Sequence, residues 1–147
     1  AAEVLLEVLA SEASPLFRRL LDSGLVNESS FASEFFEGEG YATLMFGGES
    51  NDPQAVAAAI TEELLRLRKE GIDPAAFERS RRSLYGQNLA ALNSTASIAN
   101  AILSLTFKGR ELFSYIHALA GITVADVEQF LAGLPLEQQV LSIVKPL

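Results

Sequence analysis

His117 is the side chain with the widest chemical repertoire in this sequence, and it is the only histidine. A catalytic zinc site usually takes two or three histidines from the protein and keeps one position open for water. The chain has no cysteine that could act as a thiolate ligand or as a nucleophile. Because His117 follows Ile116 and precedes Leu119 on a short predicted helix, we expect a structural or surface role for it, with catalysis as the weaker alternative.

Paired carboxylates are the next candidates, since two of them can work as general acid and general base. The pairs are Glu37 with Glu39 and Glu62 with Glu63. That chemistry requires two carboxyl groups in unequal environments. We expect the first pair in a turn and the second on a helix face, where solvation accounts for both.

A third group is cationic and consists of Arg79, Arg81 and Arg82. Glu78 lies one helical turn from Arg82, which favours a salt bridge on the helix surface. We therefore expect a solvated, salt-bridged face. An anion site would require the three guanidinium groups to converge on one concavity.

Motifs that identify common catalytic sites are missing from the sequence. It contains no G-x-S-x-G elbow, no G-x-G-x-x-G, no G-x-x-x-x-G-K-[ST] loop and no H-x-x-E-H. A serine-histidine-acid triad would have to recruit His117 from far along the chain, and spacing gives that arrangement no support. The sequence thus predicts no catalytic residue, no metal ligand and no cofactor in this chain, and it leaves substrate-binding residues unassigned.

Composition limits the class of protein further. A chain of 147 residues with 49% hydrophobic residues can build one compact domain. Its formal charge of −8 argues against a phosphate-binding surface and hence against nucleic acid. No apolar run reaches the roughly 20 residues that cross a bilayer, and no secretory leader is visible. With no cysteines, we expect no membrane partner and a cytoplasmic location.

Local start and stop signals define the elements that must position these groups. Ser14 can cap a helix whose first residue is Pro15 and which Gly24 can end. The same reasoning predicts a series of elements: a helix at the very start of the chain, the helix from 14 to 24, strands at 29–37 and 41–46, helices from 53 to 71, 74 to 92 and 94 to 109, a helix at 111–119, a helix after Thr123, and a strand at 139–144 ended by Pro146.

Three details of these helices can be checked against a structure. The helix from 53 to 71 should bury a stripe that includes Ile60, Leu64 and Leu67, with Glu62 and Arg66 paired one turn apart. The helix that starts at Ser94 should likewise bury an apolar stripe, formed by Ile98, Ile102 and Leu105. Gly86 lies inside a helix at a cost of about 1 kcal/mol relative to alanine, so we expect close packing there.

This order of elements predicts an α+β fold, with an antiparallel sheet and helices packed on one face. Three strands form a thin sheet for so many helices. A strand or two before Ala1 would explain the shortage, so we expect residues 1–147 to be one domain and a fragment of a larger protein.

Several short motifs, taken together, resemble a known family. They are S-P-L-F-x-x-L-x-x-x-G-L at 14–25, F-G-G at 46–48, D-P at 52–53, G-I-D-P at 71–74, Phe77 followed by the basic residues 79–82, the helical Gly86, L-N-S at 92–94, and I-T-x-x-D-V at 122–127. In this order they resemble the second domain of insulinase-like zinc peptidases, the pitrilysin family, and most closely its bacterial processing-protease-like branch. The resemblance covers nearly the whole chain.

The resemblance implies a clam-shaped peptidase built from related α+β halves. The first half carries an H-x-x-E-H zinc motif and the second, non-catalytic half encloses the peptide. This chain resembles the second half, so the implied zinc belongs to the upstream half, and the implied partners are that half or a paralogous chain. Many second halves carry two arginines and a tyrosine that reach toward the scissile peptide, whereas the matching positions here hold Pro15, Leu21 and Asn27.

Two other classes of function remain open at this stage. The same fold serves as a structural core subunit in respiratory complexes, and it could also serve as a peptide-binding interaction module. Neither role involves peptide cleavage. An exposed strand edge could also pair with a second copy, so a homo-oligomer is possible.

Overall fold

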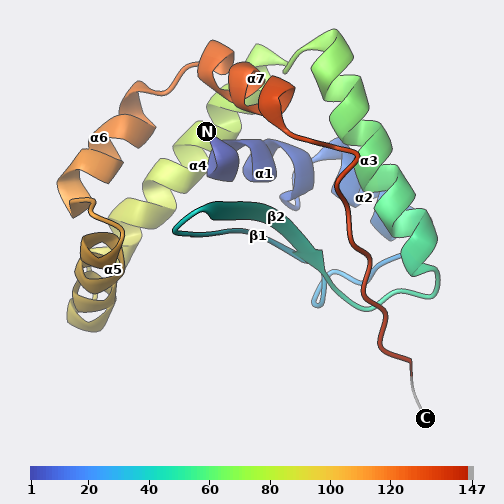
Figure 1. Ribbon diagram of the computed structural model, residues 1–147, viewed down its shortest axis with the longest axis horizontal. Coiled ribbons are helices and arrows are strands. Elements are labelled where there is room, and N and C mark those ends of the chain that lie inside the picture. Colours follow the sequence, from blue (N-terminus) through green and yellow to red (C-terminus); the bar gives the residue numbers. More distant parts are fainter. Residues whose placement is uncertain (146–147) are drawn as a thin grey trace.

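The computed structural model describes residues 1–145 of the chain and shows seven helices and two strands within them (Figure 1). The α+β class is confirmed, with a two-stranded antiparallel sheet. In chain order the elements are α1 (Ala2–Ala10), α2 (Pro15–Asp22), β1 (Ala32–Gly38), β2 (Tyr41–Gly47), α3 (Pro53–Glu70), α4 (Pro74–Ala91), α5 (Thr95–Phe107), α6 (Leu112–Gly121) and α7 (Val124–Gly133).

The helix α2 begins and ends where its local signals predict. The backbone N–H of Phe17 donates to the Ser14 hydroxyl oxygen at 3.1 Å, which satisfies a donor of the first turn. At the other end Gly24 has a φ of 69°, and the N–H of Leu25 donates back to the carbonyl of Leu20 at 3.0 Å. This is the Schellman arrangement, which uses the left-handed region that glycine adopts without strain.

The hairpin begins three residues later than the sequence predicts. The Oδ1 atom of Asn27 accepts a bond from the N–H of Ser30 at 2.8 Å, so residues 27–30 form a turn and β1 starts at Ala32. Strand β1 then pairs antiparallel with β2, and Phe35 lies opposite Leu44. Since side chains alternate across a strand, this pair faces the core and the next positions face outward.

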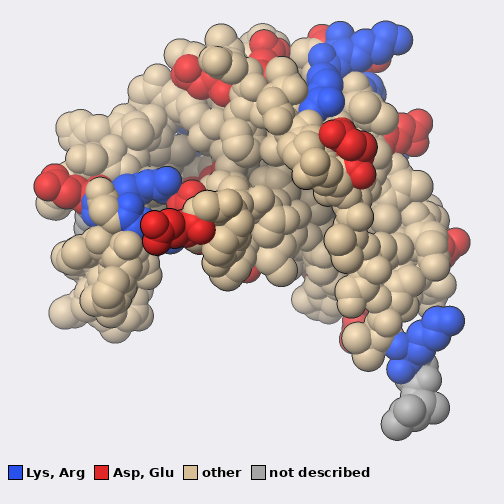
Figure 2. All heavy atoms as spheres, in the orientation of Figure 1, with Lys and Arg blue, Asp and Glu red and all other residues tan. Residues whose placement is uncertain are grey.

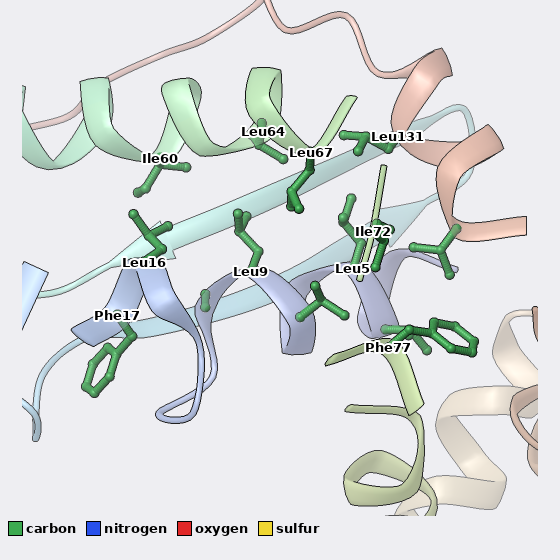
Figure 3. Close-up of a cluster of buried hydrophobic side chains, with 14 of the residues drawn as sticks. Leu5, Leu9, Leu16, Phe17, Ile60, Leu64, Leu67, Ile72, Phe77 and Leu131 are labelled. Carbon is green, nitrogen blue, oxygen red and sulfur yellow. The ribbon is translucent and has the colours of Figure 1, made fainter. Parts of the chain in front are cut away.

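The core forms around α1, which runs between the hairpin and the arch made by α3, α4 and α7 (Figure 1). Figure 3 shows Leu5 and Leu9 of α1 pointing toward Leu64 and Leu67 of α3. The largest fully buried side chains are Leu5, Leu9, Leu16, Leu20, Leu131, Val4 and Val127. All seven come from α1, α2 and α7, so the first 20 residues supply much of the interior.

The C-terminal segment differs from the prediction. Residues 139–144 form no strand, and Val140 and Val144 are 97% and 94% exposed. β-Branched residues favour strands because they pack on a pleated, half-buried surface, and within residues 1–145 the sheet consists of β1 and β2 alone, so no strand pairs with this segment. The predicted terminator, Pro146, lies outside the described residues.

Gly86 also differs from its prediction, because it has no packing partner. A Cβ built at this position has no heavy atom within 4 Å apart from its own helix backbone and chain neighbours. The close approach expected from the sequence is therefore wrong for the described part of the chain.

The helices α5 and α6 form a projection, here called the arm, which comprises residues 95–121 and extends beyond the hairpin (Figure 1). The chain bends by 114° between helices α4 and α5, at the short break that separates them. The stripe predicted on α5 is not core, since none of the α5 residues is buried. Within residues 1–145 no single helix is long and apolar enough to cross a bilayer, although α4 and α5 together meet the criteria of length and composition.

Candidate functional site

The surface around α2 is hollowed at both ends of the helix. The larger hollow, called the first hollow, has a volume of about 590 Å³ and lies at the start of α2. The loop at 11–14, the first residues of β1 and one face of α4 surround it. The α4 face contributes Arg79, Ser80, Ser83 and Gln87, whose polar groups can hydrogen-bond to a peptide main chain.

The second hollow lies where α2 ends and has a volume of about 230 Å³. Residues 24–27 and 49–51 form its walls. The Nδ2 atom of Asn27 donates to the Glu49 carboxylate at 3.1 Å and joins the two walls. This hollow is small, and the hydrogen bond that joins its walls is exposed.

The three positions that correspond to the family's arginines and tyrosine lie in different surroundings. Pro15 is exposed and lines the first hollow, whereas Asn27 is exposed and lines the second. Leu21 is partly buried and packs against the core cluster. The structure therefore does not bring Pro15, Leu21 and Asn27 together into one site.

Glu63 lies in a different environment from the solvated one that the sequence predicts. It is not solvated, because its side chain is only 4% exposed and accepts bonds from two arginines. Arg19 of α2 donates at 2.7 Å, and Arg66 donates through two nitrogens at 2.6 and 3.2 Å. Burial raises the pKa of Glu63, but the hydrogen bonds from Arg66 and Arg19 outweigh it, and the net pKa is lowered.

The predicted ion pair between Glu62 and Arg66 is also wrong. Arg66 instead contacts Glu63 and also Glu70, the latter at 2.7 Å. The signal was present in the sequence, because Glu63 lies three residues after Ile60 and four before Leu67. It therefore lies on the buried stripe of α3.

The cluster on α4 forms the salt-bridged face that the sequence predicts. Glu78 pairs with Arg81 at 3.0 Å and with Arg82 at 2.7 Å. The hydrogen bonds from Arg81 and Arg82 lower the pKa of Glu78 to about 2. Arg79 lines the first hollow. The three guanidinium groups do not converge on one concavity, which argues against an anion site.

The other carboxylate pair is also divided between two environments. Glu37 accepts bonds from Arg110 at 2.7 and 3.3 Å and from Lys108 at 3.2 Å, which tie the hairpin tip to the arm. Glu39 lies in the turn and is exposed. Burial raises the pKa of Glu37, and the hydrogen bonds from Arg110 and Lys108 lower it further than burial raises it. Structural ion pairs account for this carboxylate.

The donor set for a metal is poor in the described residues. His117 is exposed on α6, and no three acidic, cysteine or histidine side chains within residues 1–145 lie close enough to hold an ion. Zinc requires about four ligands, of which three or more come from the protein. The residues of this part of the chain do not fit zinc, and no step of a reaction is assigned to it here.

Comparisons with known proteins connect this geometry to a family. Residues 1–84 match the family model of the peptidase M16 inactive domain. The uncharacterized zinc protease YmfH of Bacillus subtilis (strain 168) is 32% identical over 125 residues, which are 85% of this chain and 29% of that protein. A crystal structure of an M16-like peptidase from Alicyclobacillus acidocaldarius superposes with a TM-score of 0.64 at 28% identity, covering 92% of this chain and 30% of that one. The chain thus spans under a third of the length of each relative.

Proposed function

The chain belongs to the M16 peptidase family, as an inactive C-terminal domain of a zinc-protease-like protein, and from this we propose that it encloses a peptide and contacts a zinc-binding half. The hydrolytic step belongs to that other half, because residues 1–145 do not offer the ligands for the metal. The zinc-binding half is either the remainder of a longer polypeptide or a paralogous chain.

The observation that carries the proposal is the first hollow at the start of α2. Its lining combines hydroxyl and amide groups with the carboxylates of Glu7 and Glu12 and with one guanidinium group, Arg79, for which no ion pair occurs within residues 1–145. Such groups bind main-chain amides with little dependence on sequence. A domain that only covers a substrate needs this kind of tolerant polar contact.

The residues that correspond to the family's arginines and tyrosine support the division of labour. Pro15 has no backbone donor, and neither it nor Leu21 or Asn27 carries a charge. Pro15 and Leu21 have no side-chain donor for the negative charge that develops on a peptide oxygen during attack, and the Asn27 amide donates to Glu49 instead. We therefore assign transition-state stabilisation to the partner and peptide enclosure to this chain.

Mixing this chain with its candidate zinc-binding half tests the proposal. Peptide hydrolysis by the zinc-binding half should rise when the chain is added. Ser83→Arg fills the first hollow with a long side chain and should raise KM in the assembled enzyme, while Ser50→Arg at the second hollow serves as the control. Ser83 is exposed, and Ser50 is partly exposed in a loop where its hydroxyl accepts one bond, from the Asp52 N–H, so each variant should fold.

Two results would count against the proposal. If the chain binds the zinc-binding half and hydrolysis does not rise, a structural core-subunit role is the better explanation. If hydrolysis rises and Ser83→Arg leaves KM unchanged, the first hollow is not a peptide contact.

A further inference from the structure

The arm presents an apolar surface that nothing in the described residues covers. Leu103 is 56% exposed and Phe107 is 83% exposed on α5, and Phe113 at the start of α6 is 70% exposed. Helix α5 contains no acidic or basic residue. In Figure 2 the part of the molecule that contains α5 has no charged side chain on the visible face.

Polar contacts at the base of the arm fix its position. Arg110 and Lys108, which join α5 to α6, bind Glu37 at the hairpin tip. The Tyr115 hydroxyl donates to the Glu3 carboxylate, and Arg81 of α4 donates to a backbone carbonyl of α6 at 2.7 Å. These bonds hold the base, while the exposed face of α5 has no partner among residues 1–145.

An uncharged apolar helix face of this kind suits a partner that stays bound. Removing α5 from water buries no ion, so the full gain from apolar burial is available. Soluble proteins rarely leave contiguous apolar surface open unless it is an interaction site. Permanent interfaces are also more apolar than transient ones.

We propose that the exposed face of α5 is the docking surface for the zinc-binding half of the protein, an inference that rests on the proposed function. More than two thirds of each relative lies outside the part that matches this chain. Glu3 contacts Tyr115 of α6, so the first residues of the chain lie at the base of the arm. Any segment that precedes them in a longer protein leaves the domain beside the arm.

A binding experiment between this chain and the separately produced zinc-binding half tests the docking surface. Leu103→Asp places a charge on the exposed face of α5. Leu65→Asp is the matched control, because Leu65 is a 51% exposed leucine on another helix, α3. We expect Leu103→Asp to weaken binding by about tenfold or more, as removal of a central apolar anchor does, and Leu65→Asp to have no effect.

Hydrogen exchange of the unsubstituted chain provides a second measurement that needs no variant. Amides of residues 95–107 should exchange more slowly when the zinc-binding half is present. Equal binding by the two aspartate variants, no binding at all, or unchanged exchange in α5 would each overturn the proposal.

Two further outcomes would assign the surface to another occupant and overturn the proposal. One is self-association of the chain that Leu103→Asp abolishes, which would indicate a second copy. The other is binding to phospholipid vesicles that the same substitution abolishes. A complex that forms through α5 without any rise in peptide hydrolysis would support the docking surface and refute the proposed function, so the two can fail separately.

Discussion

Replacement of Glu63 by glutamine is the most informative single perturbation of this fold. The substitution keeps the size of the side chain and removes its charge. It also turns one of the two carboxylate oxygens into an NH₂ group. That group must face either Arg19, now bonded at 2.7 Å, or Arg66, now bonded at 2.6 Å. The new NH₂ group and an arginine N–H, which are both donors, would then face each other.

The expected cost follows from the burial of the three groups. A hydrogen bond to a charged partner contributes about 1.5–3 kcal/mol. Water can replace part of this, because the side chains of Arg19 and Arg66 are 55% and 41% exposed. Since Glu63 is almost inaccessible, the remaining loss should be about 1–3 kcal/mol of unfolding free energy. Glu62→Gln on the exposed side of α3 should change it by less than about 0.5 kcal/mol.

The effect of Glu63→Gln should also depend on pH in a defined direction. The native pKa of Glu63 is lowered, so the carboxylate stabilises the fold fully above the unfolded pKa of about 4.3. This stability is lost as pH falls through the lower native pKa. The difference between wild type and Glu63→Gln should therefore be largest near pH 7 and should shrink below about pH 4.

Urea unfolding monitored by far-UV circular dichroism at several pH values measures both effects. The reasoning would be refuted if Glu63→Gln matched Glu62→Gln at neutral pH. It would also be refuted if the gap between Glu63→Gln and wild type stayed constant into acid.

Three smaller predictions concern a glycine, a cap and an ion pair. Gly86→Ala should raise the unfolding free energy by about 1 kcal/mol in urea titrations, because the helix gains propensity and the new methyl group meets open space. Ser14→Ala should lower it by about 1 kcal/mol, since the Phe17 N–H loses its acceptor, and Ser29→Ala in the exposed turn is the control. Glu37→Gln should speed hydrogen exchange in the arm and leave global stability nearly unchanged, because its bonds are to exposed cations.

The helix boundaries were predictable because the signals that set them are local. The side chains of Ser14, Asp52, Asp73 and Thr123 each accept a bond from a backbone N–H within three residues. A cap of this kind depends on a few neighbouring residues and on nothing distant in the chain. The same holds for the left-handed glycine that ends α2.

Features that depend on distant partners were not predictable in the same way. The burial of Glu63 requires Arg19, which lies 44 residues away. Apolar periodicity on α5 is indistinguishable from that of a core helix, and only the structure shows that no α5 residue is buried. The segment 139–144 has strand composition, but pairing requires an adjacent strand edge. The positions of Pro15, Leu21 and Asn27 are likewise set by how α2 sits on the core.

The contacts at the base of the arm have a mechanical consequence. Helix α5 leaves α4 at a sharp bend, and Gly109, with a φ of 66°, gives the connection to α6 a second pivot. The ion pairs of Glu37 with Arg110 and Lys108 help to set the angle of α5. Exposed ion pairs of this kind contribute only about 0–1 kcal/mol each. Their attraction is screened over about 8 Å at physiological salt. Breaking the Glu37 ion pairs therefore costs little, so a partner can reorient α5 on contact while Tyr115 and Arg81 still hold α6 to the core.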